Sequence, residues 1–260
     1  FVVENRPGSF GVVGAQQVAR AARDGYTFLF APASAAINVH LYRNLGYDPV
    51  NDLAPVTTVA STGYVLLVNP SVVPVKTVSE LTEYIRARPG KIAYGSGAAA
   101  AQVAAELYLS VVGLSATNVP YKGVPQALND LLGGQIHFVF ADATLGIPQA
   151  RGGKVRALAV TTAQRTSAAP DIPTMTEAGV RGDDLSGWFV VFLPAKSPPE
   201  IAQRFAELAN AAMATDKARE FLRTVSADPF PGSPDSLARC LASEIAKWGR
   251  LIKAAGIKPE

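Results

Sequence analysis

The sequence contains a glycine-rich stretch, GSGAAA at residues 95–100, whose spacing suits a phosphate-binding turn. It matches the pattern G-x-G-x-x-G/A, follows a strand-like run and opens an alanine-rich helix, as the dinucleotide fingerprint requires. That fingerprint also needs an acidic residue about 20 positions further on, where this chain has Tyr121 and Lys122. A helix N-terminus attracts any small anion through its free N–H groups and partial positive charge. Two readings therefore stay open, an NADP-dependent oxidoreductase using Lys122 and a site for a smaller anion such as a carboxylate.

Other catalytic or metal-binding patterns are missing from the sequence. The two histidines, His40 and His137, and the lone Cys240 are far apart, which argues against a transition-metal site. No Walker-type loop and no Gly-x-Ser-x-Gly elbow occurs, so Ser96 has no recognisable partner as a nucleophile. Asp183 and its neighbour lie in a polar stretch typical of a solvated turn. Apart from the NADP alternative, the sequence therefore predicts no enzyme, no cofactor and no metal.

Four turns rich in Ser, Thr and Gly follow strand-like runs. They are PASAA at residues 32–36, GSGAA at 95–99, YKGVP at 121–125 and ADATL at 141–145. In open α/β sheets the carboxyl ends of the strands line the crevice where ligands bind. We therefore expect a cleft lined by hydrogen-bond donors, with two of these turns coming from each half of the protein.

Strand-like and helix-like patterns alternate along the chain, which predicts an α/β fold with a mainly parallel sheet. Residues 1–5, FVVEN, read as a strand, and a first helical face begins at Ala15. Thr77 is the expected N-cap of a helix that Pro89 and Gly90 stop, and a further helix is expected from Val103 to Val112. Ser233 is the expected N-cap of the last helix. No repeat or flexible linker interrupts this order.

Composition limits the class of protein. The 260 residues are 48% apolar, enough for one large domain or two small ones. The net charge of +3 is small and its Lys and Arg residues are scattered, so we expect no nucleic-acid partner. No apolar run reaches the roughly 18 residues of a membrane span, which predicts a soluble chain. The first residue is Phe1 and not methionine, so we expect a segment upstream of it.

Longer phrases of the sequence resemble the Bug-type substrate-binding proteins of tripartite tricarboxylate transporters over the whole chain. They include VVENRPGSFGVVGA, DGYTFLF, YDPVNDLAPV, YKGVPQALNDLLGGQI, GGKVRALAVTT and PDIPTMTEAG. The resemblance implies a periplasmic-binding-protein type 2 fold, a "Venus flytrap" of two α/β domains joined by crossing strands. Domain 1 would combine residues 1–66 with 191–260, and domain 2 would be residues 67–190.

The same resemblance implies a periplasmic monomer that closes on a small carboxylate or amino-acid-like solute and delivers it to membrane permease subunits. A sensing role, in which the closed form docks a receptor, stays open. The residues that match the family's ligand-facing positions are Ser34, Ala35, Ser96, Gly97, Ala98, Tyr121, Lys122, Ala141 and Asp142.

Individual roles within this set stay open at the sequence level. Ser34 is either a ligand contact or a solvated hydroxyl, and Lys122 is either a ligand contact or a charge at the rim. Asp142 either recognises an amine or hydroxyl on the ligand or caps the following turn.

Two departures from the family pattern concern the grip on the ligand. Members usually begin with a further strand and helix, whose Pro-Gly-Gly loop holds one side of the carboxylate, and this chain starts after it. The turn at Gly95 is about two residues shorter than usual and has Val103 where a His is common. The identity of the ligand therefore cannot be inherited from the family.

Overall fold

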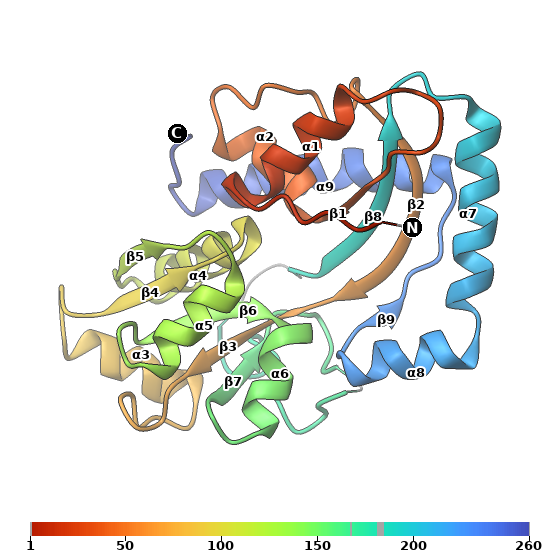
Figure 1. The fold of residues 1–260 in the computed structure, drawn as a ribbon. Helices are drawn as coiled ribbons and strands as arrows, with labels where there is room; N and C mark the ends of the chain where they lie inside the picture. The colour runs from red at the N-terminus through yellow and green to blue at the C-terminus, as the bar shows by residue number, and fades with distance from the viewer. Residues whose placement is uncertain (1, 167, 181–184, 260) are drawn as a thin grey trace.

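The structure is a computed structural model that describes residues 2–166, 168–180 and 185–259. Its strands form two sheets, and Figure 1 shows them as two lobes, one above the other in this view. The first sheet has four strands in the order β1-β8-β2-β9, and the second has five in the order β5-β4-β6-β3-β7. The fold class is therefore α/β, as predicted.

The first sheet consists of β1 (Leu29–Pro32), β2 (Leu53–Thr62), β8 (Gly187–Pro194) and β9 (Asp228–Pro229). Its helices are the short 3-10 helix η1 (Ser9–Gly11), α1 (Val12–Ala19), α2 (Ser34–Leu41), α7 (Pro199–Met213), α8 (Asp216–Thr224) and α9 (Pro234–Ala254). Helices cover both faces of this sheet, as the alternating side chains of β8 show. Val190 and Phe192 pack into the core beneath α2 and α9, whereas Val191 and Leu193 pack against α7.

The second sheet consists of β3 (Tyr64–Val68), β4 (Ala93–Ser96), β5 (Thr117–Pro120), β6 (Phe138–Asp142) and β7 (Arg156–Val160). Its helices are α3 (Val78–Arg86), α4 (Ala99–Val112), α5 (Val124–Leu132) and α6 (Ala143–Arg151). All five residues of β3 are buried. This central strand therefore reads as a continuous apolar run because helices cover both of its faces.

The single residue Gly63 connects β2 to β3, and the longer segment at residues 161–186 connects β7 to β8. The chain leaves β2 at Thr62 and enters β3 at Tyr64, and it returns after β7 to begin β8 at Gly187. Thr161 ties these crossings together, because its Oγ1 accepts a hydrogen bond from the Tyr64 N–H (3.0 Å) and donates one to the Leu185 carbonyl (3.0 Å). The chain thus passes from one sheet to the other at Gly63 and again before Gly187.

The prediction of a mainly parallel sheet is wrong. Between the named strands, only the β4–β5 and β4–β6 pairs are parallel, and β3 runs antiparallel to both β6 and β7. The first sheet pairs are all antiparallel. The alternation of strands and helices is real, but a strand that enters from another sheet can run in either direction, and periodicity does not reveal which.

Several element boundaries also differ from the predictions. Residues 2–5 belong to no strand, because no described segment pairs with them. The turn expected at residues 32–36 is the start of α2, whose residues are buried nearly all round and so lack a helical hydrophobic pattern. Helix α4 starts at Ala99, four residues before the expected Val103. The predicted caps are confirmed, since Thr77 accepts from Glu80 N–H and Ser233 forms a capping box with Ser236.

Candidate functional site

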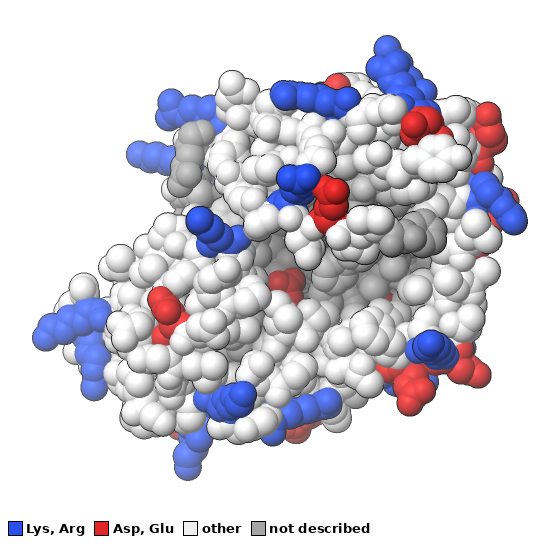
Figure 2. All heavy atoms as spheres, viewed as in Figure 1, with Lys and Arg blue, Asp and Glu red and all other residues white. Residues whose placement is uncertain are grey.

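Three of the predicted turns meet at one edge of the second sheet. Because β4, β5 and β6 run parallel, their carboxyl ends and the N-termini of α4, α5 and α6 lie along the same edge. Only the turn after β1 comes from the first sheet, so the expected two-and-two division is wrong. Figure 2 shows this face hollowed between the two lobes, with an acidic side chain visible inside the hollow.

The turn between β4 and α4 lies at this edge of the sheet, where Gly97 is buried and Ala98 is partly exposed. Ala98 is the N-cap of α4 and makes no side-chain cap bond, so the N-cap residue leaves the first N–H groups of the helix uncapped. A Cβ added to Gly97 would lie 2.5 Å from Val124 N at the start of α5, so only glycine fits this close approach. Ser96 is fully buried, and its hydroxyl donates to Asn118 Oδ1 at 2.7 Å. The Ser96 hydroxyl thus already donates its hydrogen bond to a side chain of β5.

In the turn between β5 and α5, Tyr121 is partly buried and Lys122 is exposed. The Tyr121 hydroxyl donates to Asp130 Oδ2 at 2.7 Å. Burial raises the pKa of Tyr121 to about 12, with a smaller contribution from this hydrogen bond. The phenol is therefore neutral, and its hydroxyl is already hydrogen-bonded to Asp130 of α5. The Lys122 side chain is exposed.

Asp142 closes β6 and occupies the N-cap position of α6. It is only partly exposed, and burial raises the pKa of its carboxyl from 3.8 to about 6. Its backbone pairs with Tyr64 on β3, whose buried phenol has a pKa raised well above 10 by burial and by the charges of Asp142 and Glu244. The preceding residue, Ala141, is fully buried in the core.

The first sheet contributes the start of α2 and a turn that the sequence analysis did not single out. Ser34 is the first residue of α2, and its Oγ lies 3.6 Å from the position of a Cβ on Gly11. Ala35 beside it is buried. Helix α2 packs against α4, which joins the two halves of the site.

The missed turn covers residues 8–11, and all four have positive φ, including the non-glycine residues Ser9 (46°) and Phe10 (51°). Asn38 of α2 holds the turn by donating to the Phe10 carbonyl at 3.2 Å. Strained backbone of this kind gathers at binding sites. The signal in the sequence is PGSFG at residues 7–11, with two glycines that permit positive φ.

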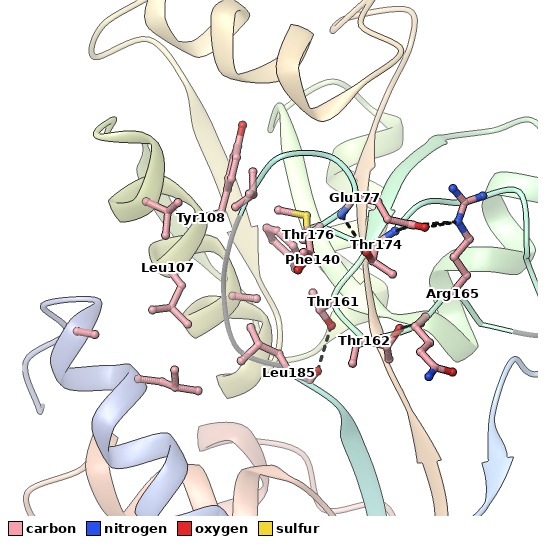
Figure 3. A pocket seen from close by; sticks show the side chains of 18 residues that line it. Leu107, Tyr108, Phe140, Thr161, Thr162, Arg165, Thr174, Thr176, Glu177 and Leu185 are labelled. Atoms are coloured by element: carbon pink, nitrogen blue, oxygen red, sulfur yellow. Dashed lines mark hydrogen bonds and ion pairs between the residues drawn. The ribbon is translucent and has the colours of Figure 1, made fainter.

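A separate cavity of about 610 Å³ lies between α4, α9 and the segment after β7 (Figure 3). None of the nine predicted residues lines it. Its wall is mainly apolar, and Arg165 is already paired with Glu177 at 2.9 Å and bonded to the Pro170 carbonyl. Among the lining residues that the structure describes, a carboxylate would find neither a free cation nor a helix N-terminus, so the hollow is the better candidate for an anion.

The described residues hold no group of three His, Cys, Asp or Glu side chains that could bind a metal ion. Among the same residues, no helix has the length and apolar character needed to cross a membrane.

Comparisons with known proteins place this architecture in a family. The family model described as "Tripartite tricarboxylate transporter family receptor" matches residues 1–257. Protein BugT of Bordetella pertussis is 32% identical over 99% of this chain and 80% of its own length.

Solved structures of similar proteins agree with this match. R. palustris Rpa4515 with adipate has a TM-score of 0.96 and 36% identity, covering 100% of this chain and 88% of its own. Periplasmic binding protein BugD has a TM-score of 0.94 and 30% identity, with coverage of 100% and 88%. MatC from Rhodopseudomonas palustris with bound malate has a TM-score of 0.87 and 26% identity, with coverage of 94% and 85%. The two-domain binding-protein fold is thereby confirmed, and the chain belongs to the tripartite tricarboxylate transporter receptor family, the Bug-type solute-binding proteins.

Proposed function

We propose that this chain is a periplasmic solute-binding protein that captures a small carboxylate in the hollow between its two sheets. The observation that carries the proposal is the start of α4 at the carboxyl edge of the second sheet, where the N-cap makes no side-chain bond and the preceding turn accepts only glycine at Gly97. Similar proteins hold adipate and malate, which are both dicarboxylates. A carboxylate suits such a helix start because the N–H groups and the helix dipole favour negative charge.

The proposed ligand contacts come from both sheets. From the second sheet we propose the backbone N–H groups at Gly97 and Ala98, the exposed Lys122 at the rim and the carboxyl of Asp142. From the first sheet we propose Ser34 and the turn at residues 8–11. The side chains of Ser96 and Tyr121 support the site indirectly, since each is bonded to a neighbour on β5 or α5.

The proposed action is closure of two domains whose boundaries lie at Gly63 and just before Gly187. Ligand that contacts both domains stabilises the closed form, and the two crossings between the sheets serve as the hinge. The proposal includes delivery of the solute to membrane permease subunits of a tripartite tricarboxylate-type transporter, and the family match supports it.

The test is a thermal-shift screen with mono-, di- and tricarboxylates, aromatic acids, acidic amino acids and NADP. A ligand that binds only the folded protein raises its melting temperature. We expect a carboxylate to do so and to compact the protein in small-angle scattering. Stabilisation by NADP alone would instead favour an oxidoreductase and contradict the proposal.

The partner requires a separate experiment. Membrane extracts are passed over the immobilised protein with and without its carboxylate. Capture of permease subunits that depends on the ligand is the expected result, and capture of a receptor protein in their place would contradict a transport role.

A further inference from the structure

The separate cavity between α4, α9 and the segment after β7 combines a buried apolar floor with a volume suited to a small molecule. Its floor consists of Phe140 on β6 and of Ala104 and Tyr108 on α4, each at most 2% exposed. Its volume of about 610 Å³ falls in the range of about 300–1,000 Å³ that is typical of small-molecule sites. Because apolar surface in contact with water is unfavourable, apolar atoms that fill the cavity are stabilised there.

The polar side chains in the wall of this cavity are already hydrogen-bonded within the protein. Thr161 makes the two bonds of the crossing described above. The Thr162 hydroxyl donates to a backbone carbonyl two residues further on at 2.6 Å, and the Thr174 hydroxyl accepts from a backbone N–H at 3.1 Å. The Tyr108 hydroxyl is bonded to the Thr82 hydroxyl at 2.8 Å. A ligand in the cavity therefore meets few polar groups that are free to bind it.

The charged groups at the rim of the cavity neutralise each other. Arg165 and Glu177 are the charged side chains among the described lining residues, and they form an ion pair at 2.9 Å. Figure 3 shows this pair joined on the side opposite Leu107. A charged ligand group would lose its hydration here without gaining a free counter-charge from these residues, which is costly. The cavity therefore favours neutral molecules.

Two polar side chains at the rim are left for a ligand. Gln164 and Thr176 are exposed, and their side chains make no hydrogen bond with another described residue. The partly buried Met175 adds a flexible thioether to the wall, which adapts to ligands of different shape.

We propose that this cavity is a second binding site, which takes a small, neutral and mainly apolar molecule with an aromatic or aliphatic body. One or two hydrogen-bonding groups on that molecule would face Gln164 and Thr176. The site is separate from the proposed carboxylate site, because none of the nine residues predicted from the sequence lines it. The inference therefore does not rest on the proposed function, and it can be tested without a carboxylate.

The test uses two fluorescent probes that share an anilinonaphthalene body. N-phenyl-1-naphthylamine is neutral, and 1-anilinonaphthalene-8-sulfonate carries one sulfonate. Dissociation constants are measured by fluorescence titration of the wild-type protein. We expect the neutral probe to bind about tenfold or more tightly than the anionic probe, because the cavity offers the sulfonate no free cation. Equal affinities, or no saturable binding of the neutral probe, would overturn the inference.

Two lysine variants locate the bound probe. Val111 lines the cavity and is 52% exposed, whereas Leu208 is 53% exposed and lines a smaller apolar groove beside α7. Val111→Lys should weaken binding of the neutral probe about fivefold or more, because it places a hydrated charge in the wall. It should also narrow the difference between the two probes, because it supplies a cation. Leu208→Lys should leave both affinities within about twofold of wild type. The opposite pattern would place the probe in the α7 groove and overturn the inference.

A variant on another wall tests the site by filling it. Ala254 is exposed at the end of α9, and Ala254→Trp adds an indole at the cavity without adding charge. It should also weaken binding of the neutral probe about fivefold or more. Because Val111 and Ala254 are both exposed, the variants should keep the unfolding midpoint of wild type, which circular dichroism checks. An unchanged affinity for the neutral probe in both folded variants would overturn the inference.

Discussion

Replacing Asp142 by asparagine should stabilise the ligand-free protein, and more so at neutral than at acid pH. Burial raises the pKa of this carboxyl from 3.8 to about 6. An acid whose pKa is higher in the folded state than in the unfolded state contributes its stability below the unfolded value. That contribution is lost as the pH rises through the folded value. At neutral pH, therefore, the ionised Asp142 opposes folding.

The magnitude follows from the same two pKa values. At about 1.36 kcal/mol for each pKa unit, the change from 3.8 to about 6 corresponds to at most about 3 kcal/mol above pH 7. The partial exposure of the side chain to water makes this a ceiling. Between about pH 4.5 and about pH 7.5, the linkage relation gives a change of about 2 kcal/mol. The variant's advantage in unfolding free energy should grow by that amount over this range.

The assay is urea unfolding, followed by circular dichroism, of the ligand-free wild type, Asp142→Asn and the control Asp171→Asn at these two pH values. Asp171 is an exposed aspartate, so its replacement should change stability by less than about 0.5 kcal/mol at either pH. An unfolding free-energy difference between Asp142→Asn and wild type that is the same at both pH values would refute the reasoning. So would a variant that is less stable than wild type at neutral pH and not at acid pH.

Three further predictions concern the turn, the crossing and the cofactor. Gly97→Ala should cost about 1–3 kcal/mol of stability and weaken carboxylate binding, because the added Cβ would lie 2.5 Å from backbone atoms. The control in the same denaturation and binding assays is Gly152→Ala, whose Cβ would meet nothing closer than 3.5 Å. Thr161→Val should lower the unfolding free energy measured with urea by about 1–3 kcal/mol, because it leaves the Tyr64 N–H and the Leu185 carbonyl without this partner. An unchanged unfolding midpoint would contradict the role of Thr161 at the crossing. NADP at millimolar concentration should leave the melting temperature unchanged, and a rise would restore the oxidoreductase hypothesis.

The sequence predicts best those elements whose hydrophobic pattern and caps agree. Helix α3 has its apolar residues Val78, Leu81 and Ile85 on one face behind the Thr77 cap, and helix α9 has the Ser233 cap. Each pattern indicates the helix and its start together. Helix α2 gives no such pattern, because Ala35, Ala36, Ile37 and Leu41 are all buried and the helix has no polar face.

The site could be predicted as a region but not as a set of contacts. The glycine turn at residues 95–98 and Asp142 do lie at the carboxyl ends of parallel strands, as the pattern of strand-end turns indicates. The direction of each side chain depends on tertiary contacts that no spacing reveals. Asn118 draws the Ser96 hydroxyl toward β5, and Asp130 draws the Tyr121 hydroxyl toward α5. The strained turn at residues 8–11 has glycines as its signal, but only the structure shows it beside Ser34.

The measurement that tests the central claim most directly is a titration of the ¹⁵N-labelled protein with the diacid that gives the largest thermal shift. The two candidate regions are far apart in sequence, so backbone amide shifts distinguish them. If the hollow binds the carboxylate through the starts of α4 and α2, the largest changes should lie at Gly97 to Ala101 and around Ser34. Changes confined to the residues that line the separate cavity, from Thr161 to Glu177, or none at saturating diacid, would contradict the account.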